Sequence, residues 1–329
     1  MIITQTPLRI SFAGGGTDLA AYYEKHEGFV VSSAIDKYAF VIVKERFDDK
    51  IYLNAMQKEI VDHVDSLEHE LVREAMRLTG VESGVEVTLL SDIPSEGAGL
   101  GSSSSFTVGL LNAFYIYRGE QVTAERLARE ACQIEIERLG KPIGKQDQYI
   151  AAYGGLRWFR FCRDGNVESG RLSVPTQRRR ELSDRLHLFF TGRTRKADVI
   201  LSEQRANTGE RRKQLDGIRE LALELRPALE LGDNDRLGTI LHVNWELKRE
   251  LASGISDAAI EEMYALARGN GATGGKICGA GGGGFLLTYC PLDRRDSLME
   301  GMVAYRSMPF ALEPDGSKVI FNYRRDVGK

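Results

Sequence analysis

The sequence predicts a two-domain protein that combines β-strands with α-helices. Its 329 residues exceed the size at which a single hydrophobic core usually stops growing. The first 60 residues read as short β-rich runs between turns, whereas long helical patterns dominate beyond residue 197. A polar segment over 177–184 separates these halves. We therefore expect a first domain over 1–178 and a second over 179–329.

The N-terminal half alternates apolar and polar residues in short stretches typical of strands. Strands are expected over 2–4, 8–12, 29–34, 38–43 and 85–90, and a β-hairpin over 156–175 around Asp164-Gly165. Apolar residues at helical spacing predict helices that begin near Leu19 and cover 67–78, 106–115 and 123–139.

The C-terminal half begins with a strand over 186–190, and helices are expected over 197–231, 235–251 and 257–268. A glycine-rich block over 274–284 then leads into a strand. Gly279, Gly281 and Gly284 match G-x-G-x-x-G, but that dinucleotide-binding pattern follows a strand and opens a helix. A nicotinamide oxidoreductase is therefore disfavoured, and no Walker A pattern is present.

The glycine and serine run over 94–105 has the composition of a phosphate-binding loop. Glycine permits positive φ and close approach of a ligand, and serines are good N-cap residues for the helix that follows. The positive end of that helix stabilises an anion, and a serine hydroxyl suits Mg²⁺. An ordinary glycine turn is the alternative. The cofactor-binding candidates are Gly97, Ala98, Gly99, Leu100, Gly101, Ser102, Ser103 and Ser104.

An earlier glycine block over 13–19 could line a small ligand. Asp18 offers two acceptors to hydroxyl groups, although it could simply cap the helix that follows. Arg9 could be a surface charge or an inward-facing cation for a transferred phosphate.

Two acidic residues beyond the serine loop are candidates for chemistry. Glu135 shares the apolar face of its helix with Ala128 and Ala131, so it is either a metal ligand or a member of a buried salt bridge. Asp147, with Lys145 nearby, could be a general base or a helix N-cap.

The composition is that of an ordinary globular protein, with 42% hydrophobic and 28% charged residues. A net charge of −3 argues against nucleic-acid binding, and we interpret the basic run over 178–180 as a solvated stretch between domains. Four dispersed cysteines indicate reduced thiols rather than zinc or disulfides. No signal peptide or membrane-spanning run is visible, so we expect a cytoplasmic protein. Whether it forms a homo-oligomer stays open.

Taken together, the three glycine blocks resemble the motifs of the GHMP kinase superfamily. The matching stretches are 6–18, 94–104 and 276–284, in the family's order. The resemblance implies an α+β fold, with an N-terminal ATP-binding domain like ribosomal protein S5 domain 2 and a ferredoxin-like C-terminal domain. It also implies ATP and Mg²⁺ as cofactors and an active site between the domains.

The resemblance assigns roles to individual residues. Asp147 matches the family's general base, Glu135 and Ser103 its Mg²⁺ ligands, and Arg9 a basic residue near the reacting oxygen. The substrate residues would be Gly15, Gly16, Thr17, Asp18, Lys145, Arg193, Arg195, Gly281 and Gly282.

Within the superfamily, the stretches 14–18, 35–38 and 190–195 look like those of the D-glycero-D-manno-heptose 7-phosphate kinases. These enzymes make the 1,7-bisphosphate for nucleotide-activated heptose in capsule or surface glycans. A phosphorylated substrate needs cationic donors, for which Lys145, Arg193, Arg195 and Lys196 are candidates, unless they are surface charge. A kinase for L-fucose or galactose, and a non-catalytic sugar sensor, remain as alternatives.

Overall fold

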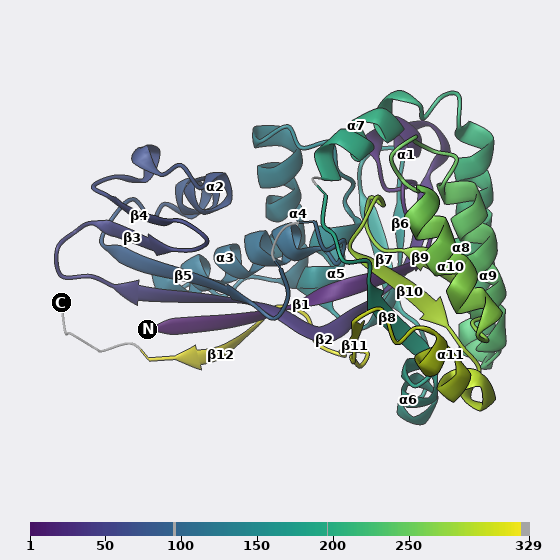
Figure 1. Cartoon of the computed structure of the whole chain (residues 1–329). Helices are drawn as coiled ribbons and strands as arrows, with labels where there is room; N and C mark the ends of the chain where they lie inside the picture. The colour runs from purple at the N-terminus through teal and green to yellow at the C-terminus, as the bar shows by residue number, and fades with distance from the viewer. Residues whose placement is uncertain (95–96, 196, 324–329) are drawn as a thin grey trace.

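The computed structural model describes residues 1–94, 97–195 and 197–323, and its strands form two sheets (Figure 1). The eight strands of the larger sheet are β1 (Ile2–Ala13), β2 (Gly28–Glu45), β3 (Ile51–Asn54), β4 (Lys58–Val61), β5 (Val85–Ser91), β6 (Leu156–Phe161), β7 (Val167–Arg171) and β12 (Lys318–Asn322). Its main path is β12-β1-β2-β5-β3-β4, and the β6-β7 hairpin pairs with β2. The smaller sheet has the order β11 (Ser307–Met308), β8 (Leu186–Phe190), β10 (Phe285–Tyr289), β9 (Gly274–Ile277).

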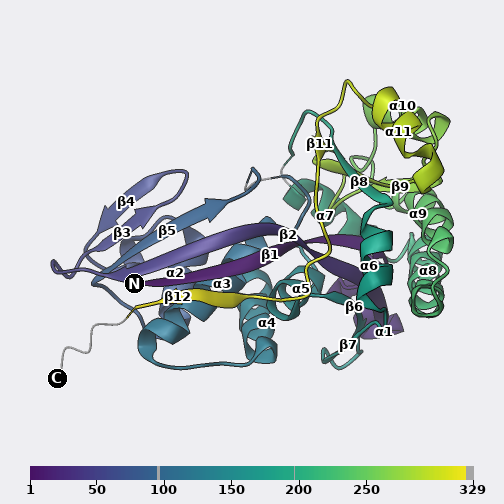
Figure 2. The same ribbon diagram turned by 90° about the horizontal axis from the view of Figure 1, so that it is seen from below.

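Helices of the N-terminal half cover one face of the larger sheet. They are α2 (Glu70–Thr79), α3 (Ser102–Arg118), α4 (Ala124–Cys132) and α5 (Gln146–Tyr153), with a short 3-10 turn, η1 (Val64–Ser66), before α2. Figure 1 shows α3, α4 and α5 above β1 and β12, and in Figure 2, seen from below, β12 passes in front of α3. The buried side chains of these helices pack with those of the larger sheet in a single apolar cluster.

The remaining helices are α1 (Ala20–His26), α6 (Thr176–Ser183), α7 (Ala197–Ala206), α8 (Arg212–Leu231), α9 (Asp235–Lys248), α10 (Ala258–Gly269) and α11 (Arg295–Gly301), with a 3-10 turn, η3 (Leu292–Arg294). Of these, α8, α9 and α10 stack beside β9 and β10 (Figure 1). A second apolar cluster joins Leu8 and Ile10 of β1 to Leu241 of α9 and Leu287 of β10. The two halves therefore share buried surface, and the α+β, two-domain expectation is confirmed.

The two longest strands are longer than the sequence predicts. β1 joins the segments expected over 2–4 and 8–12, and β2 joins those over 29–34 and 38–43. The pairing of β1 with β2 shifts register between Pro7 and Leu8, opposite the connecting residues of β2. The chain therefore bends at an irregularity in the ladder instead of breaking into two strands.

Helical segments also differ from expectation at three places. The helix expected over 197–231 is interrupted between Ala206 and Arg212, where Gly209 lies in a turn. The helix expected over 123–139 changes to a π-helical segment, η2 (Gln133–Arg138). The polar stretch over 177–184, for which no helix was predicted, forms most of α6, including the basic run. In the described part of the chain, no helix has the length and apolar character needed to cross a membrane.

Candidate active site

The second and third glycine blocks pack against each other with little space between their backbones. A Cβ added to Gly99 would lie 2.5 Å from the carbonyl oxygen of Cys278, and one added to Gly279 would lie 2.6 Å from Cα of Gly99. Both glycines have positive φ. Because a side chain would separate these backbones, glycine is required at both positions. The block over 274–284 does lead into a strand, β10, as expected.

The loop ends at the N-terminus of α3. Gly101 in the left-handed region is the N-cap, so the expectation that serines cap this helix is wrong. Ser102, Ser103 and Ser104 form the first turn, where backbone N–H groups have no intrahelical acceptor. Ala98 and Leu100 are buried and hold the loop against the second apolar cluster. Residues 95 and 96 of the predicted phosphate loop lie outside the described residues. The described part has the geometry of an anion site.

Glu135 lies completely buried behind this helix end. Its carboxylate accepts hydrogen bonds from Ser103 Oγ at 2.6 Å, Ser104 Oγ at 2.7 Å and Gln148 Nε2 at 2.7 Å. Burial raises the pKa of Glu135, and its hydrogen-bond donors offset part of that rise. All three donors are neutral groups, so the salt bridge considered for Glu135 is absent among the described residues.

The oxygen atoms around Glu135 fit a hard divalent cation. Glu135 and Ser103 supply a carboxylate and a hydroxyl, which Mg²⁺ prefers. Ser102 Oγ and Gln148 Oε1 are buried without a hydrogen-bond partner in the described chain. Buried oxygens seldom lack a partner, so a ligand would complete this site. Within residues 1–94, 97–195 and 197–323 there is no group of three His, Cys, Asp or Glu for a metal, so a cation would also need oxygens from its phosphate ligand.

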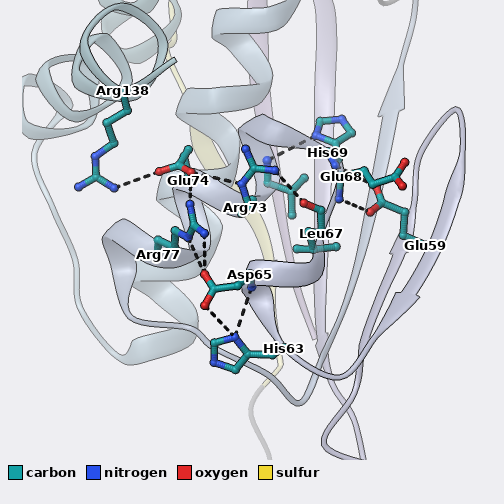
Figure 3. Close-up of polar contacts among 11 residues, drawn as sticks. Glu59, His63, Asp65, Leu67, Glu68, His69, Arg73, Glu74, Arg77 and Arg138 are labelled. Carbon is teal, nitrogen blue, oxygen red and sulfur yellow. Dashed lines mark hydrogen bonds and ion pairs between the residues drawn. The ribbon is translucent and has the colours of Figure 1, made fainter. Parts of the chain in front are cut away.

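The segment that carries Glu135 is fastened to α2 by two ion pairs. Arg138 Nη1 lies 3.4 Å from a carboxylate oxygen of Glu74, and Lys141 Nζ lies 2.8 Å from that of Glu70. The backbone N–H of Lys141 donates to the carbonyl of Glu135 at 2.9 Å. Figure 3 shows Arg138 pointing at Glu74 from the neighbouring helix. These contacts hold the π-helical segment in place, which is a setting common at functional sites.

Arg9 connects the phosphate loop to Asp147. Its guanidinium donates to both carboxylate oxygens of Asp147, at 2.7 and 2.6 Å, and to the carbonyl of Gly99 at 2.6 Å. Asp147 lies in the first turn of α5 and is 26% exposed, whereas Arg9 is buried. A Cβ added to Gly101 would lie 3.4 Å from Asp147 Oδ2. Asp147 is therefore no helix cap, and Arg9 is no surface charge.

The first glycine block contacts the residues that precede Asp147. Asp18 accepts hydrogen bonds from the backbone N–H of Gly16 at 2.9 Å and of Gln146 at 3.2 Å. It does not cap α1, whose N-cap is Leu19, so that alternative is wrong. Burial, and then the charge of Asp147, raise the pKa of Asp18. Gly15 adjoins the hydroxyl of Ser11, and Thr17 is buried with its hydroxyl on the carbonyl of Gly14.

The predicted cationic residues do not form one group. Lys145 donates to the carbonyl of Gly165 at 2.6 Å, and its ammonium lies over the ring of Tyr23. Arg193 and Arg195 instead converge on Asp257, at 2.5 and 3.7 Å. Lys196 lies outside the described residues.

The arginine pair lies beside two of the glycine blocks. A Cβ added to Gly282 would lie 3.3 Å from Cδ of Arg195, and one added to Gly97 would lie 2.7 Å from its backbone N. Gly281 packs on Ile255. The arginines and the phosphate loop are therefore neighbours.

Two buried lysines were not singled out from the sequence. Lys276 Nζ reaches the carbonyl of Phe12 at 3.4 Å, and burial lowers its pKa to about 8. Lys248 Nζ donates to the carbonyl of Ile277 at 2.9 Å and to that of Gly279 at 2.5 Å. Lys248 thus supports the turn that meets Gly99. The available sequence signal was a lysine three residues before Gly279, inside the third glycine block.

Comparison with known proteins agrees with this arrangement. Residues 66–155 match the family description "GHMP kinases N terminal domain", and residues 225–305 match "GHMP kinases C terminal". A D-glycero-alpha-D-manno-heptose 7-phosphate kinase from Campylobacter jejuni is 31% identical over 318 residues, covering 92% of this chain and 93% of that protein. An L-fucokinase/L-fucose-1-P guanylyltransferase from Bacteroides fragilis is 28% identical. That match spans 86% of this chain and 34% of the relative's length.

Among solved structures, a D-glycero-D-manno-heptose 1-phosphate kinase from Bacteroides thetaiotaomicron superposes with a TM-score of 0.83 at 25% identity. The match covers 98% of this chain and all of that one. Both family matches fall on the halves that supply the phosphate loop and the third glycine block. The chain therefore belongs to the GHMP kinases, a family of phosphotransferases that use ATP as the phosphate donor.

Proposed function

We propose that this kinase transfers the γ-phosphoryl group of ATP to the anomeric C1 hydroxyl of D-glycero-D-manno-heptose 7-phosphate, giving the 1,7-bisphosphate. The position of Asp147 carries the proposal. Its carboxylate adjoins the phosphate loop at Gly101, and the residue before it, Gln146, donates its backbone N–H to the sugar-binding candidate Asp18 at 3.2 Å. A base between donor and acceptor sites is what phosphoryl transfer to a hydroxyl requires. The similarity to a heptose 7-phosphate kinase supports the choice of sugar.

Each residue of the site has a separate role in the proposed transfer. Amides of the first turn of α3 bind phosphate oxygens of ATP, and Arg9 keeps the carboxylate of Asp147 in one orientation. Asp147 accepts the hydroxyl proton while the sugar oxygen bonds to the γ-phosphorus and the bond to the bridging oxygen breaks. Glu135 and Ser103 would hold Mg²⁺, which neutralises phosphate charge. Positioning and charge neutralisation supply most of the rate in such transfers.

The 7-phosphate of the substrate would meet Arg193 and Arg195. Their side chains are 33% and 49% exposed, so part of each guanidinium is accessible beyond the contact with Asp257. Arginine suits phosphate because its N–H groups form a planar fork. A heptose bisphosphate made in the cytoplasm would serve the synthesis of nucleotide-activated heptose for capsule or surface glycans.

The pairing of Arg193 with Asp257 favours one alternative. A guanidinium already neutralised by a carboxylate attracts a phosphate less strongly, so a kinase for an unphosphorylated sugar such as L-fucose or galactose is the second candidate. The catalytic residues would be unchanged. A coupled assay of Mg²⁺- and ATP-dependent ADP release, comparing the heptose 7-phosphate with heptose, galactose and fucose, separates the two. Preference for an unphosphorylated sugar would replace the first proposal by the second.

Asp147→Asn tests the mechanism for either sugar. Loss of a positioned general base typically lowers the turnover rate by about 10²–10⁴-fold. Nucleotide binding should persist, because the α3 amides are untouched. Asp296→Asn, on the exposed first turn of α11, is the matched control and should turn over like wild type. Wild-type turnover by Asp147→Asn would remove Asp147 from the mechanism.

A further inference from the structure

Gln204 of α7 is a largely buried residue whose side-chain amide makes no hydrogen bond to the described residues. The residue is 4% exposed. Its backbone carbonyl accepts a hydrogen bond from Thr208 Oγ1 at 3.1 Å, but its side-chain amide has no partner within residues 1–94, 97–195 and 197–323. The amide atoms are not among the fully buried polar atoms that lack a partner, so they keep some contact with solvent and a ligand can reach them.

The amide of Gln204 lies against the first glycine block. A Cβ added to Gly16 would lie 2.4 Å from Gln204 Nε2, and Gly16 has a φ of +96° that disfavours any other residue. The N–H of Gly16 donates to Asp18. Gly16 is thus a neighbour of both the carboxylate of Asp18 and the carboxamide of Gln204. Two polar groups from distant parts of the chain converge where the sugar is expected.

Helix α7 also reaches the third glycine block. Ile200, one helical turn before Gln204, would lie 2.8 Å from a Cβ on Gly282. The carboxylate of Glu203 accepts from the backbone N–H and the hydroxyl of Ser253, at 2.7 and 2.9 Å. These contacts fix the helix along both blocks, so the Gln204 amide has a defined position.

We infer that Gln204 determines substrate specificity by hydrogen bonding to a hydroxyl group of the sugar held at Gly16 and Asp18. The inference rests on the proposed function as a sugar kinase. A carboxamide offers two N–H donors and a carbonyl acceptor, which matches a hydroxyl that both donates and accepts. It is neutral, so it suits a sugar hydroxyl better than a phosphate, which is left to charged residues.

The test uses Gln204→Leu, which keeps the volume near that of glutamine and removes its polar atoms. We expect the KM for the sugar to rise roughly 10- to 100-fold, because a site built to bond a hydroxyl loses that interaction. The KM for ATP should stay within about twofold, since the phosphate loop is untouched. Gln177→Leu, the same substitution at an exposed position of α6 whose amide bonds Glu181, is the matched control and should leave the sugar KM unchanged. If Gln204→Leu does not fold, Gln204→Met, with a flexible side chain of similar length, replaces it.

Deoxy analogues of the accepted sugar identify the partner hydroxyl. With wild type, the analogue that lacks this hydroxyl should have a higher KM than the full sugar. With Gln204→Leu, its KM should rise no further. An unchanged sugar KM in the variant, or equal rises for sugar and ATP, would overturn the assignment of Gln204 while the kinase function stands. Failure of wild type to release ADP with every sugar tested would overturn the proposed function and this inference with it.

Discussion

Two buried glutamates on neighbouring segments, Glu74 of α2 and Glu135 of η2, accept hydrogen bonds from different kinds of donor. Glu74 of α2 accepts hydrogen bonds from Arg77 at 2.6 Å, Arg73 at 3.3 Å and Arg138 at 3.4 Å. Figure 3 shows these arginines gathered around its carboxylate. Glu135 of η2 accepts comparably short bonds, but from two hydroxyls and an amide. The carboxylate of Glu74 therefore forms ion pairs with arginines, whereas the carboxylate of Glu135 forms no ion pair with the described residues.

The pKa values follow this difference. Burial raises the pKa of Glu74, but the hydrogen bonds from its arginines more than offset that rise and leave it lowered. Burial dominates at Glu135, whose pKa is raised. A carboxylate that the fold has already paired is a structural group. A carboxylate held only by neutral donors is short of positive charge, which a bound cation would supply.

The largest effect that separates the two glutamates is expected in catalysis. Glu135→Gln should lower the turnover rate by about 10²–10³-fold, the loss typical of removing one electrostatic stabiliser from an active site. Glu74→Gln is the matched substitution and should keep turnover within a few-fold of wild type. Steady-state ADP release over a range of Mg²⁺ concentrations measures both. Equal losses in the two variants would show that Glu135 acts through packing alone.

A smaller effect is expected in the free energy of unfolding, and here Glu74→Gln should lose more than Glu135→Gln. Glu74→Gln leaves three arginines around a neutral group, and we expect the free energy of unfolding to fall by about 1–3 kcal/mol. The partial exposure of these arginines keeps the loss below that of a fully buried ion pair. Urea unfolding without Mg²⁺ measures it, with Glu82→Gln, at an exposed position just beyond α2, as the control. A Glu74→Gln protein as stable as wild type would mean that the arginine cluster contributes nothing measurable.

Parts of this contrast could be predicted from the sequence and parts could not. The apolar spacing around Glu135 predicted its burial, because the π-helical segment changes the helix only locally and leaves the face intact. The arginine contacts of Glu74 include a partner 64 residues away, for which no local pattern exists. The pairing of Arg193 with Asp257, across the same separation, was unpredictable for the same reason.

The glycine blocks were more informative than the charges. A run of glycines reports a local backbone requirement, so the loop before α3 and the turn after β9 could be recognised from their letters. Their mutual contact at Gly99 and Gly279 is a consequence of topology, and the sequence suggested it only through resemblance to a family. Gln204 escaped notice because a single glutamine in a polar helix carries no pattern.

The smallest predicted effect is a pH dependence that has opposite signs at the two glutamates. The pKa of Glu135 is raised above its ordinary value of 4.5, so its contribution to stability is present below that value and is lost as the pH rises through the folded-state pKa. The stability of Glu135→Gln relative to wild type should therefore increase as the pH rises from about 4 to about 8. For Glu74, whose pKa is lowered, the contribution is present above 4.5 and is lost as the pH falls through the folded-state pKa, so wild type gains on Glu74→Gln over the same range. Urea unfolding of both variants and wild type across this range measures the two slopes. Slopes of the same sign would mean that neutral donors and arginines stabilise a buried carboxylate equally. Glu135 would then have no greater need of a bound cation than Glu74. Added Mg²⁺ should reduce the relative gain of Glu135→Gln near neutral pH, because a cation that binds only the folded wild type stabilises it.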